Sequence, residues 1–176
     1  SDVDIVKSPK QVKTPLAYCP KYSFMAGYRH VRKPRLEMPV FDDAFVDFCK
    51  RKAQEHFSAY VNDPNVFGYF SDNELKWYDG GLADHLKIKD SSDKNYTTAR
   101  TFLEKRGKSA NKYDKEDEDA YVALMGERYY SVVSKAIKSV DPNHMYLGTR
   151  CHSSERDNQA FMENASPGNA ENGRNE

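Results

Sequence analysis

The sequence lacks long apolar runs, an excess of charge of one sign and a cysteine framework. The mean hydropathy is −0.89, and no stretch resembles the roughly 20 apolar residues that cross a bilayer, so we expect neither a membrane span nor a signal peptide in it. Lysine plus arginine and aspartate plus glutamate both number 27, so no global field favours binding to nucleic acid or to a membrane. Cys19, Cys49 and Cys151 are widely separated and odd in number, which argues against a disulfide framework and leaves at least one free thiol.

Aromatic residues are plentiful, with 12 Tyr, 9 Phe and a single Trp among 176 residues. Such a number supplies the core of one ordinary domain, and it also suits a surface that stacks on sugar rings. Residues 1–13 are polar and contain a proline, and we interpret them as a linker or edge segment. Residues 153–176 are rich in Asn, Glu, Ser and Gly, which predicts a short helix followed by a polar tail.

Three short apolar runs are typical of buried strands. They cover residues 14–19 between Pro15 and Pro20, residues 66–70, and residues 144–150. Helical spacing of apolar residues predicts long helices over 42–60 and 118–140 and a shorter one over 97–106, closed by Gly107. Strands that alternate with helices imply parallel pairing and right-handed crossovers, so the predicted class is α/β with an insertion after the second strand.

Two charged segments are predicted to be exposed to solvent. A long loop is expected after the first strand, and it contains the basic residues Arg29, His30, Arg32, Lys33 and Arg35. The basic cluster could face an acidic ligand, but a solvated loop is the simpler interpretation. The charge run over 112–119 is interpreted as the solvated entry of the last long helix.

Polar groups follow the predicted strands where each strand ends. Asp72, Asn73 and Glu74 follow the second strand, and the third strand ends in Arg150 with His152 shortly after it. Because functional groups of parallel α/β folds collect at the carboxyl ends of the strands, we expect them on one rim. A carboxylic acid there beside Trp77 would be partly desolvated, which raises its pKa and suits a general acid for glycosidic cleavage. A helix cap or a loop salt bridge is the competing interpretation of Glu74.

Three stretches of the sequence carry a resemblance to known enzymes. Val-Phe-Gly-Tyr-Phe-Ser-Asp-Asn-Glu-Leu-Lys-Trp (66–77) and Asp-Pro-Asn-His-Met-Tyr-Leu-Gly-Thr-Arg (141–150) look like the fourth and fifth strand regions of clan A glycoside hydrolases, most nearly the β-agarase and β-galactosidase-like families. Met-Pro-Val-Phe-Asp-Asp-Ala-Phe (38–45) looks like the start of the helix before the acid/base strand. The stretches follow one another in the order of the family.

The resemblance implies a retaining hydrolase on a (β/α)8 TIM barrel, with residues 14–152 as a partial catalytic barrel. Glu74 matches the acid/base and Asn73 the asparagine that contacts the hydroxyl next to the anomeric carbon. Asp72, Trp77, Arg150 and His152 are expected to bind substrate. The family's nucleophile is a second glutamate after the seventh strand, and no candidate for it is present. Since a full barrel takes about 250 residues, we interpret the chain as a fragment of a larger enzyme of polysaccharide degradation.

The same resemblance implies a galactose-containing substrate such as agar, no cofactor, and a secreted or periplasmic location. Because an open part of a barrel exposes strand edges and apolar helix faces, we also expect self-association through those edges. A non-catalytic module that binds saccharide or a partner remains the alternative. A metal site of His144, Cys151 and His152 matches no closed zinc pattern, and a nucleophilic pair of His152 with Cys19 or Cys151 lacks a recognisable oxyanion hole. The patterns Asn95-Tyr96-Thr97 and Asn164-Ala165-Ser166 fit N-glycosylation acceptors but are explained by chance.

Overall fold

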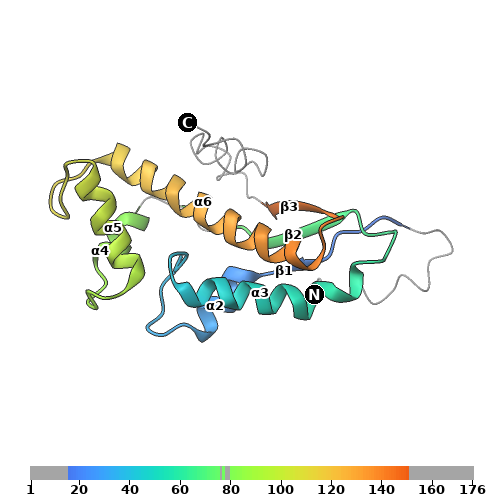
Figure 1. The fold of residues 1–176 in the computed structure, drawn as a ribbon. Helices are drawn as coiled ribbons and strands as arrows, with labels where there is room; N and C mark the ends of the chain where they lie inside the picture. The colour runs from blue at the N-terminus through green and yellow to red at the C-terminus, as the bar shows by residue number, and fades with distance from the viewer. Residues whose placement is uncertain (1–15, 76, 78–79, 151–176) are drawn as a thin grey trace.

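Three parallel strands and six helical segments make up the described part of the chain. The computed structural model describes residues 16–75, 77 and 80–150, so the predicted linker over 1–13 and the predicted helix and tail over 153–176 lie outside it (Figure 1). The sheet has the order β1 (Lys21–Tyr22), β2 (Gly68–Asn73), β3 (Met145–Arg150), with both pairs parallel. The predicted parallel α/β alternation is therefore confirmed.

The first strand lies later in the sequence than predicted. We expected it over 14–19, ended by Pro20, but β1 begins after that proline. The carbonyl of Pro20 accepts a hydrogen bond from the Phe70 amide at 3.0 Å, and Tyr18 forms backbone bonds with Asn65 and Phe67 at 2.9 and 3.0 Å. A proline on an edge strand can contribute its carbonyl without needing a donor. Pro20 therefore lies within the paired segment instead of ending it.

The second and third strands lie close to their predicted positions. Strand β2 continues to Asn73, three residues past the predicted end, and β3 begins one residue after the predicted start. At Gly68 a Cβ atom would lie 2.6 Å from the carbonyl oxygen of Met145, so only glycine permits this strand spacing. The register between β2 and β3 shifts on both sides of Ser71, which turns the end of β2 relative to its start.

The expected basic loop is largely a helix, α2 (Phe24–Val31), and this prediction was wrong. Arg29 and His30 lie in its last turn. Arg32, just beyond it, is only 8% exposed and forms ion pairs with Asp42 and Asp93. The residue before the helix, Ser23, is of a type that commonly caps helices, but its side chain forms no cap hydrogen bond here.

Two long helices cover one face of the sheet and confirm their predicted patterns. Helix α3 (Asp43–Phe57) continues into a 3-10 turn, η2 (Ser58–Tyr60), and α6 (Lys115–Val140) is the longest element. Asp114 and Asp117 form a reciprocal capping box at the start of α6. Figure 1 shows α3 and α6 side by side in front of the sheet. Within the described ranges, no helix has the length and apolarity required to cross a membrane.

The predicted insertion after β2 contains two short helices, α4 (Gly81–Leu86) and α5 (Lys94–Lys105). Helix α5 matches the predicted helix, and Gly107 ends it with a φ of 68°. Helix α4 was not predicted. Its amides at Leu82 and Ala83 donate to the Glu118 carboxylate, each at 3.2 Å. In Figure 1 the two helices lie at the end of α6 that points away from the sheet.

The charge run over 112–119 is only partly solvated, which corrects the prediction. Asp117 is fully buried and Glu118 is 8% exposed. Arg106 and Lys108 pair with Asp117, and the hydrogen bond from Arg106 outweighs burial and lowers the pKa of Asp117 to about 2. These acidic side chains join the insertion to the start of α6, because a buried carboxylate requires donors.

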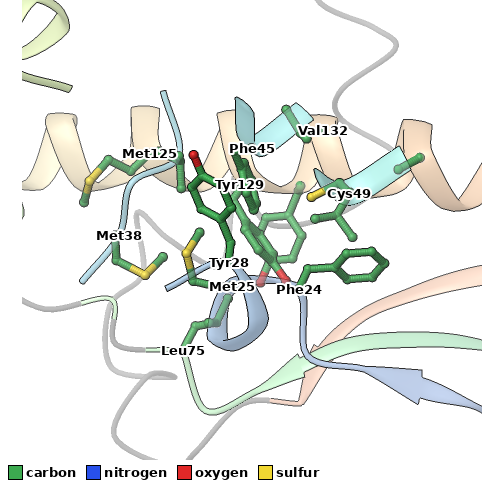
Figure 2. Packing of buried hydrophobic residues seen from close by; sticks show 14 of the residues in the cluster. Phe24, Met25, Tyr28, Met38, Phe45, Cys49, Leu75, Met125, Tyr129 and Val132 are labelled. Atoms are coloured by element: carbon green, nitrogen blue, oxygen red, sulfur yellow. The ribbon is translucent and has the colours of Figure 1, made fainter. Parts of the chain in front are cut away.

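Aromatic and aliphatic side chains from α2, α3, α6 and the sheet form one core (Figure 2). Phe24, Met25, Phe45, Cys49 and Tyr129 are fully buried in it. Burial raises the pKa of the Cys49 thiol, so this cysteine is an inert core residue.

The core packing of α6 predicts a large loss of stability for Ile137→Ala. Ile137 is fully buried, and its truncation leaves a cavity that costs about 2–5 kcal/mol of unfolding free energy. Lys135→Ala, an exposed position on the same helix, should change stability by no more than about 0.5 kcal/mol. Urea denaturation measures both. Equal effects of the two substitutions would contradict the assigned orientation of α6.

The lowered pKa of Asp141 predicts that the protein loses stability in acid. Burial disfavours its charge, but hydrogen bonds from the Tyr69 hydroxyl and from the ring and amide of His144 outweigh this and lower its pKa to about 2. A carboxyl group whose pKa is lower in the folded state stabilises the protein above its unfolded pKa of about 3.9, and this stabilisation is lost as pH falls towards 2.

We therefore expect Asp141→Asn to lower stability by about 1–2 kcal/mol at pH 7. The difference from the unsubstituted chain should shrink between about pH 5 and pH 2. Denaturant titrations across this pH range provide the measurement. A difference that stays constant with pH would show that the Asp141 charge has no part in folding.

Candidate functional site

The carboxyl ends of β2 and β3 lie together, as the strand pattern predicted. Asn73 pairs with Arg150 across the two strands, and the Glu74 amide donates to the Arg150 carbonyl at 2.8 Å. Tyr22, at the end of β1, pairs with Ser71. One edge of the sheet therefore presents Asn73, Glu74 and Arg150, whereas His152 lies outside the described residues.

Asn73 and Glu74 are two exposed residues between buried neighbours. Asp72 on one side is 1% exposed, and Leu75 and Trp77 on the other side are 4% and 6% exposed. The chain thus leaves the core for two residues and returns to it. This arrangement presents one amide and one carboxylate from a segment that is anchored at both ends.

The carboxylate of Asp72 is directed into the protein. Its oxygens accept from the Met25 amide at 3.0 and 3.1 Å, from the Ala26 amide at 3.3 Å and from the Tyr129 hydroxyl at 2.5 Å. Burial raises the pKa of Asp72, and these hydrogen bonds oppose the shift. The sequence suggested a substrate contact for Asp72, but its oxygens are engaged by α2 and α6. The Asp72 side chain therefore caps helix α2, which lies where the sequence predicted a loop.

Trp77 also points into the core. Its ring meets the Tyr129 ring edge-on, with centroids 5.8 Å apart, and lies 6.2 Å from that of Tyr130. The sequence suggested that Trp77 binds substrate and desolvates Glu74. In the described part of the chain Trp77 is instead buried against α6 and Glu74 is exposed.

The backbone at this strand end is strained. Asp72 has a φ of 30° and Glu74 a φ of 52°, and they are the two non-glycine residues with positive φ in the described ranges. Such angles are uncommon for residues with a Cβ atom and persist only where surrounding contacts hold them. The contacts that hold them here are the Asp72 hydrogen bonds and the bond from the Glu74 amide to β3.

Tyr129 is the residue at this site that the sequence did not identify. It belongs to the apolar residues at helical spacing that predict the helix over 118–140, and it is buried. Its hydroxyl group reaches Asp72, which is 57 residues earlier. The spacing of apolar residues predicts which face of a helix is buried but not which polar atom a buried tyrosine meets.

The other candidate chemistries find little support in the described residues. His144 bonds through Nδ1 to Asp141 at 2.6 Å, and the described ranges contain no group of three or more His, Cys, Asp or Glu residues arranged to hold a metal. Cys151 and His152 lie outside those ranges, so their pairing with each other or with Cys19 stays untested. Asn95 of the first glycosylation pattern is fully buried and accepts from the Phe41 amide, so it is closed to glycan attachment in the folded protein.

Solved glycoside hydrolase structures share this fold. The chain matches BpGH50 with a TM-score of 0.76 and 29% sequence identity, over 93% of this chain and 39% of that one. An exo-beta-agarase matches with a TM-score of 0.56 and 21% identity, over 64% of this chain and 20% of that one. The agarase AgWH50C matches with a TM-score of 0.56 and 20% identity, over 84% and 24%.

No family model matches the sequence, and no curated protein matches it. The structural matches confirm the relationship to agarase-like glycoside hydrolases that the three sequence stretches predicted. The chain spans 39% of the length of BpGH50 and smaller shares of the two agarases. It therefore has the fold of one part of an agarase-like glycoside hydrolase.

Proposed function

We propose that these residues are the acid/base portion of a retaining glycoside hydrolase that cleaves an agar-type, galactose-containing polysaccharide. In this proposal β1, β2 and β3 are consecutive strands of a (β/α)8 barrel, and the remaining strands come from outside the 176 residues. The observation that carries it is the exposed Asn73-Glu74 pair, held between buried anchors at the carboxyl edge of a parallel sheet. Active sites of such barrels form at that edge.

Glu74 is assigned the role of general acid and base. As an acid it donates a proton to the oxygen of the departing sugar, and in the second step it takes a proton from the attacking water. The amide of Asn73 is assigned to the sugar hydroxyl next to the anomeric carbon. Both side chains are exposed at the strand end, where a bound sugar could reach them. This chemistry requires no cofactor.

The nucleophile is assigned to a glutamate outside this chain. Retaining hydrolysis needs two carboxyl groups about 5–5.5 Å apart. Of the described strands, only β2 ends in carboxylates, and its Asp72 is buried and bonded to α2 and α6. Arg150 and His152 remain proposed substrate contacts. For Asp72 and Trp77 the burial favours a supporting role over contact with the sugar.

The substrate class rests on the neighbours that are described as agarases, because no group in this chain identifies a sugar. A polymer of this kind would meet the enzyme outside the cytoplasm, which is consistent with a secreted or periplasmic location. The alternative function is a saccharide-binding module without turnover. The described strand ends lack a second exposed carboxylate. A saccharide-binding role is therefore favoured if the protein contains no further barrel strands.

Glu74→Gln in the full-length protein tests the catalytic role. We expect agarose hydrolysis to fall by about 10²–10⁴-fold, because the amide cannot protonate a poor leaving group. Glu127→Gln, an exposed carboxylate on α6, should leave the rate unchanged. Reducing-sugar release gives the rates, and proton NMR of the first product gives its anomeric configuration. Near-normal activity of Glu74→Gln, or an inverted product, would overturn the assignment.

The 176 residues in isolation should show no turnover. The outer edges of β1 and β3 are unpaired within the described sheet, and Phe67 and Met145 are 56% and 47% exposed. Such edges pair with other strands, so we also expect concentration-dependent self-association, which light scattering measures. Sugar release by the isolated chain at the rate of the full-length protein would show that it already contains the nucleophile.

A further inference from the structure

Tyr129 contacts both anchors that flank the exposed Asn73-Glu74 pair. Its hydroxyl group donates to Asp72, the residue before the pair, at 2.5 Å. Its ring meets the ring of Trp77, which follows the pair, at a centroid distance of 5.8 Å. One side chain from α6 therefore touches the strand end on either side of Glu74.

The Tyr129 ring is itself held firmly in the core. It stacks on Phe45 of α3 with an interplanar angle of 22° and is fully buried. Figure 2 shows Tyr129 in the same cluster as Phe45, Met25 and Leu75. A rigid aromatic ring gives its hydroxyl group a fixed position, which a flexible side chain could not provide.

The Asp72 carboxylate also binds the N-terminus of helix α2. Both Asp72 oxygens accept from the Met25 amide and one also accepts from the Ala26 amide. A carboxylate at a helix N-terminus satisfies amides that otherwise lack partners and interacts favourably with the helix dipole. Asp72 thus joins β2 to α2 and, through Tyr129, to α6, while its own backbone and that of Glu74 have positive φ.

We propose that Tyr129 and Asp72 are positioning residues for Glu74, and that their hydrogen bond fixes the direction in which the acid faces its substrate. The proposal rests on the proposed function of Glu74. Without the Tyr129 hydroxyl group, Asp72 keeps its backbone donors but loses its tie to α6. The strained strand end can then relax, and Glu74 moves relative to the leaving oxygen. A displacement of about 1 Å in an active site can reduce the rate 10²-fold.

The test compares Tyr129→Phe, Asp72→Asn and Glu74→Gln in the full-length protein. The substrates are the phenyl and the 2,4-dinitrophenyl glycosides of the repeating disaccharide of agarose. The measured quantity is kcat/KM, which reports the first, acid-assisted step. The dinitrophenyl group leaves with little help from an acid, whereas the phenyl group requires protonation. A misplaced acid therefore slows the phenyl substrate selectively.

We expect Tyr129→Phe and Asp72→Asn to reduce kcat/KM for the phenyl glycoside by about 10- to 100-fold, and for the dinitrophenyl glycoside by less than about 3-fold. Tyr121→Phe is the matched control. Tyr121 lies fully buried on the same helix, and its hydroxyl group bonds to His85 at 2.8 Å and not to the strand end. This control should affect both substrates equally, in proportion to any loss of folded protein.

The outcomes separate the two proposals. If Glu74→Gln is selective for the phenyl substrate but Tyr129→Phe behaves like Tyr121→Phe, the positioning role is overturned and the function of Glu74 stands. If Glu74→Gln itself shows no selectivity, the proposed function fails. Should Asp72→Asn not fold, Tyr129→Phe decides alone, because it retains the buried ring and its packing.

Discussion

The hydrogen bonds of the Asp72 carboxylate join three parts of the fold, which are strand β2, helix α2 and helix α6. The residue ends the regular part of β2, caps α2 from 47 residues away and accepts the Tyr129 hydroxyl group of α6. A buried carboxylate is costly unless donors surround it, so these partners and the strained backbone of Asp72 and Glu74 depend on one another. The exposure of Asn73 and Glu74 follows, because their neighbours on both sides are fixed inside the core.

The sequence predicted the elements whose stability comes from local patterns. Helices α3 and α6 have apolar residues at helical spacing, and β2 and β3 are apolar runs bounded by polar residues. The sequence therefore predicted these two helices and these two strands. Helix α2 was missed because its cap comes from Asp72, and α4 because its cap comes from Glu118. Pro20 was misleading, since a paired edge strand can include a proline that offers only its carbonyl.

The sequence predicted where the candidate site lies, but not the directions in which its side chains point. Parallel strands bring Asn73, Glu74 and Arg150 to one edge, and this follows from alternation alone. The inward direction of Asp72 and the burial of Trp77 do not follow from it, because they depend on the register shifts around Ser71 and on which side chains α6 presents. The Tyr129 contact joins residues far apart in the sequence, so no local pattern indicates it.

The central claim is that Glu74 acts as the acid and base of a two-step retaining reaction, and anion rescue tests it most directly. In the full-length protein with Glu74→Ala, a dinitrophenyl glycoside can still form the covalent intermediate, but water cannot be activated to release it. Azide needs no general base, so adding it should restore turnover and give a glycosyl azide of the same anomeric configuration as the substrate. Turnover that azide leaves unchanged, or an azide product of inverted configuration, would contradict the account.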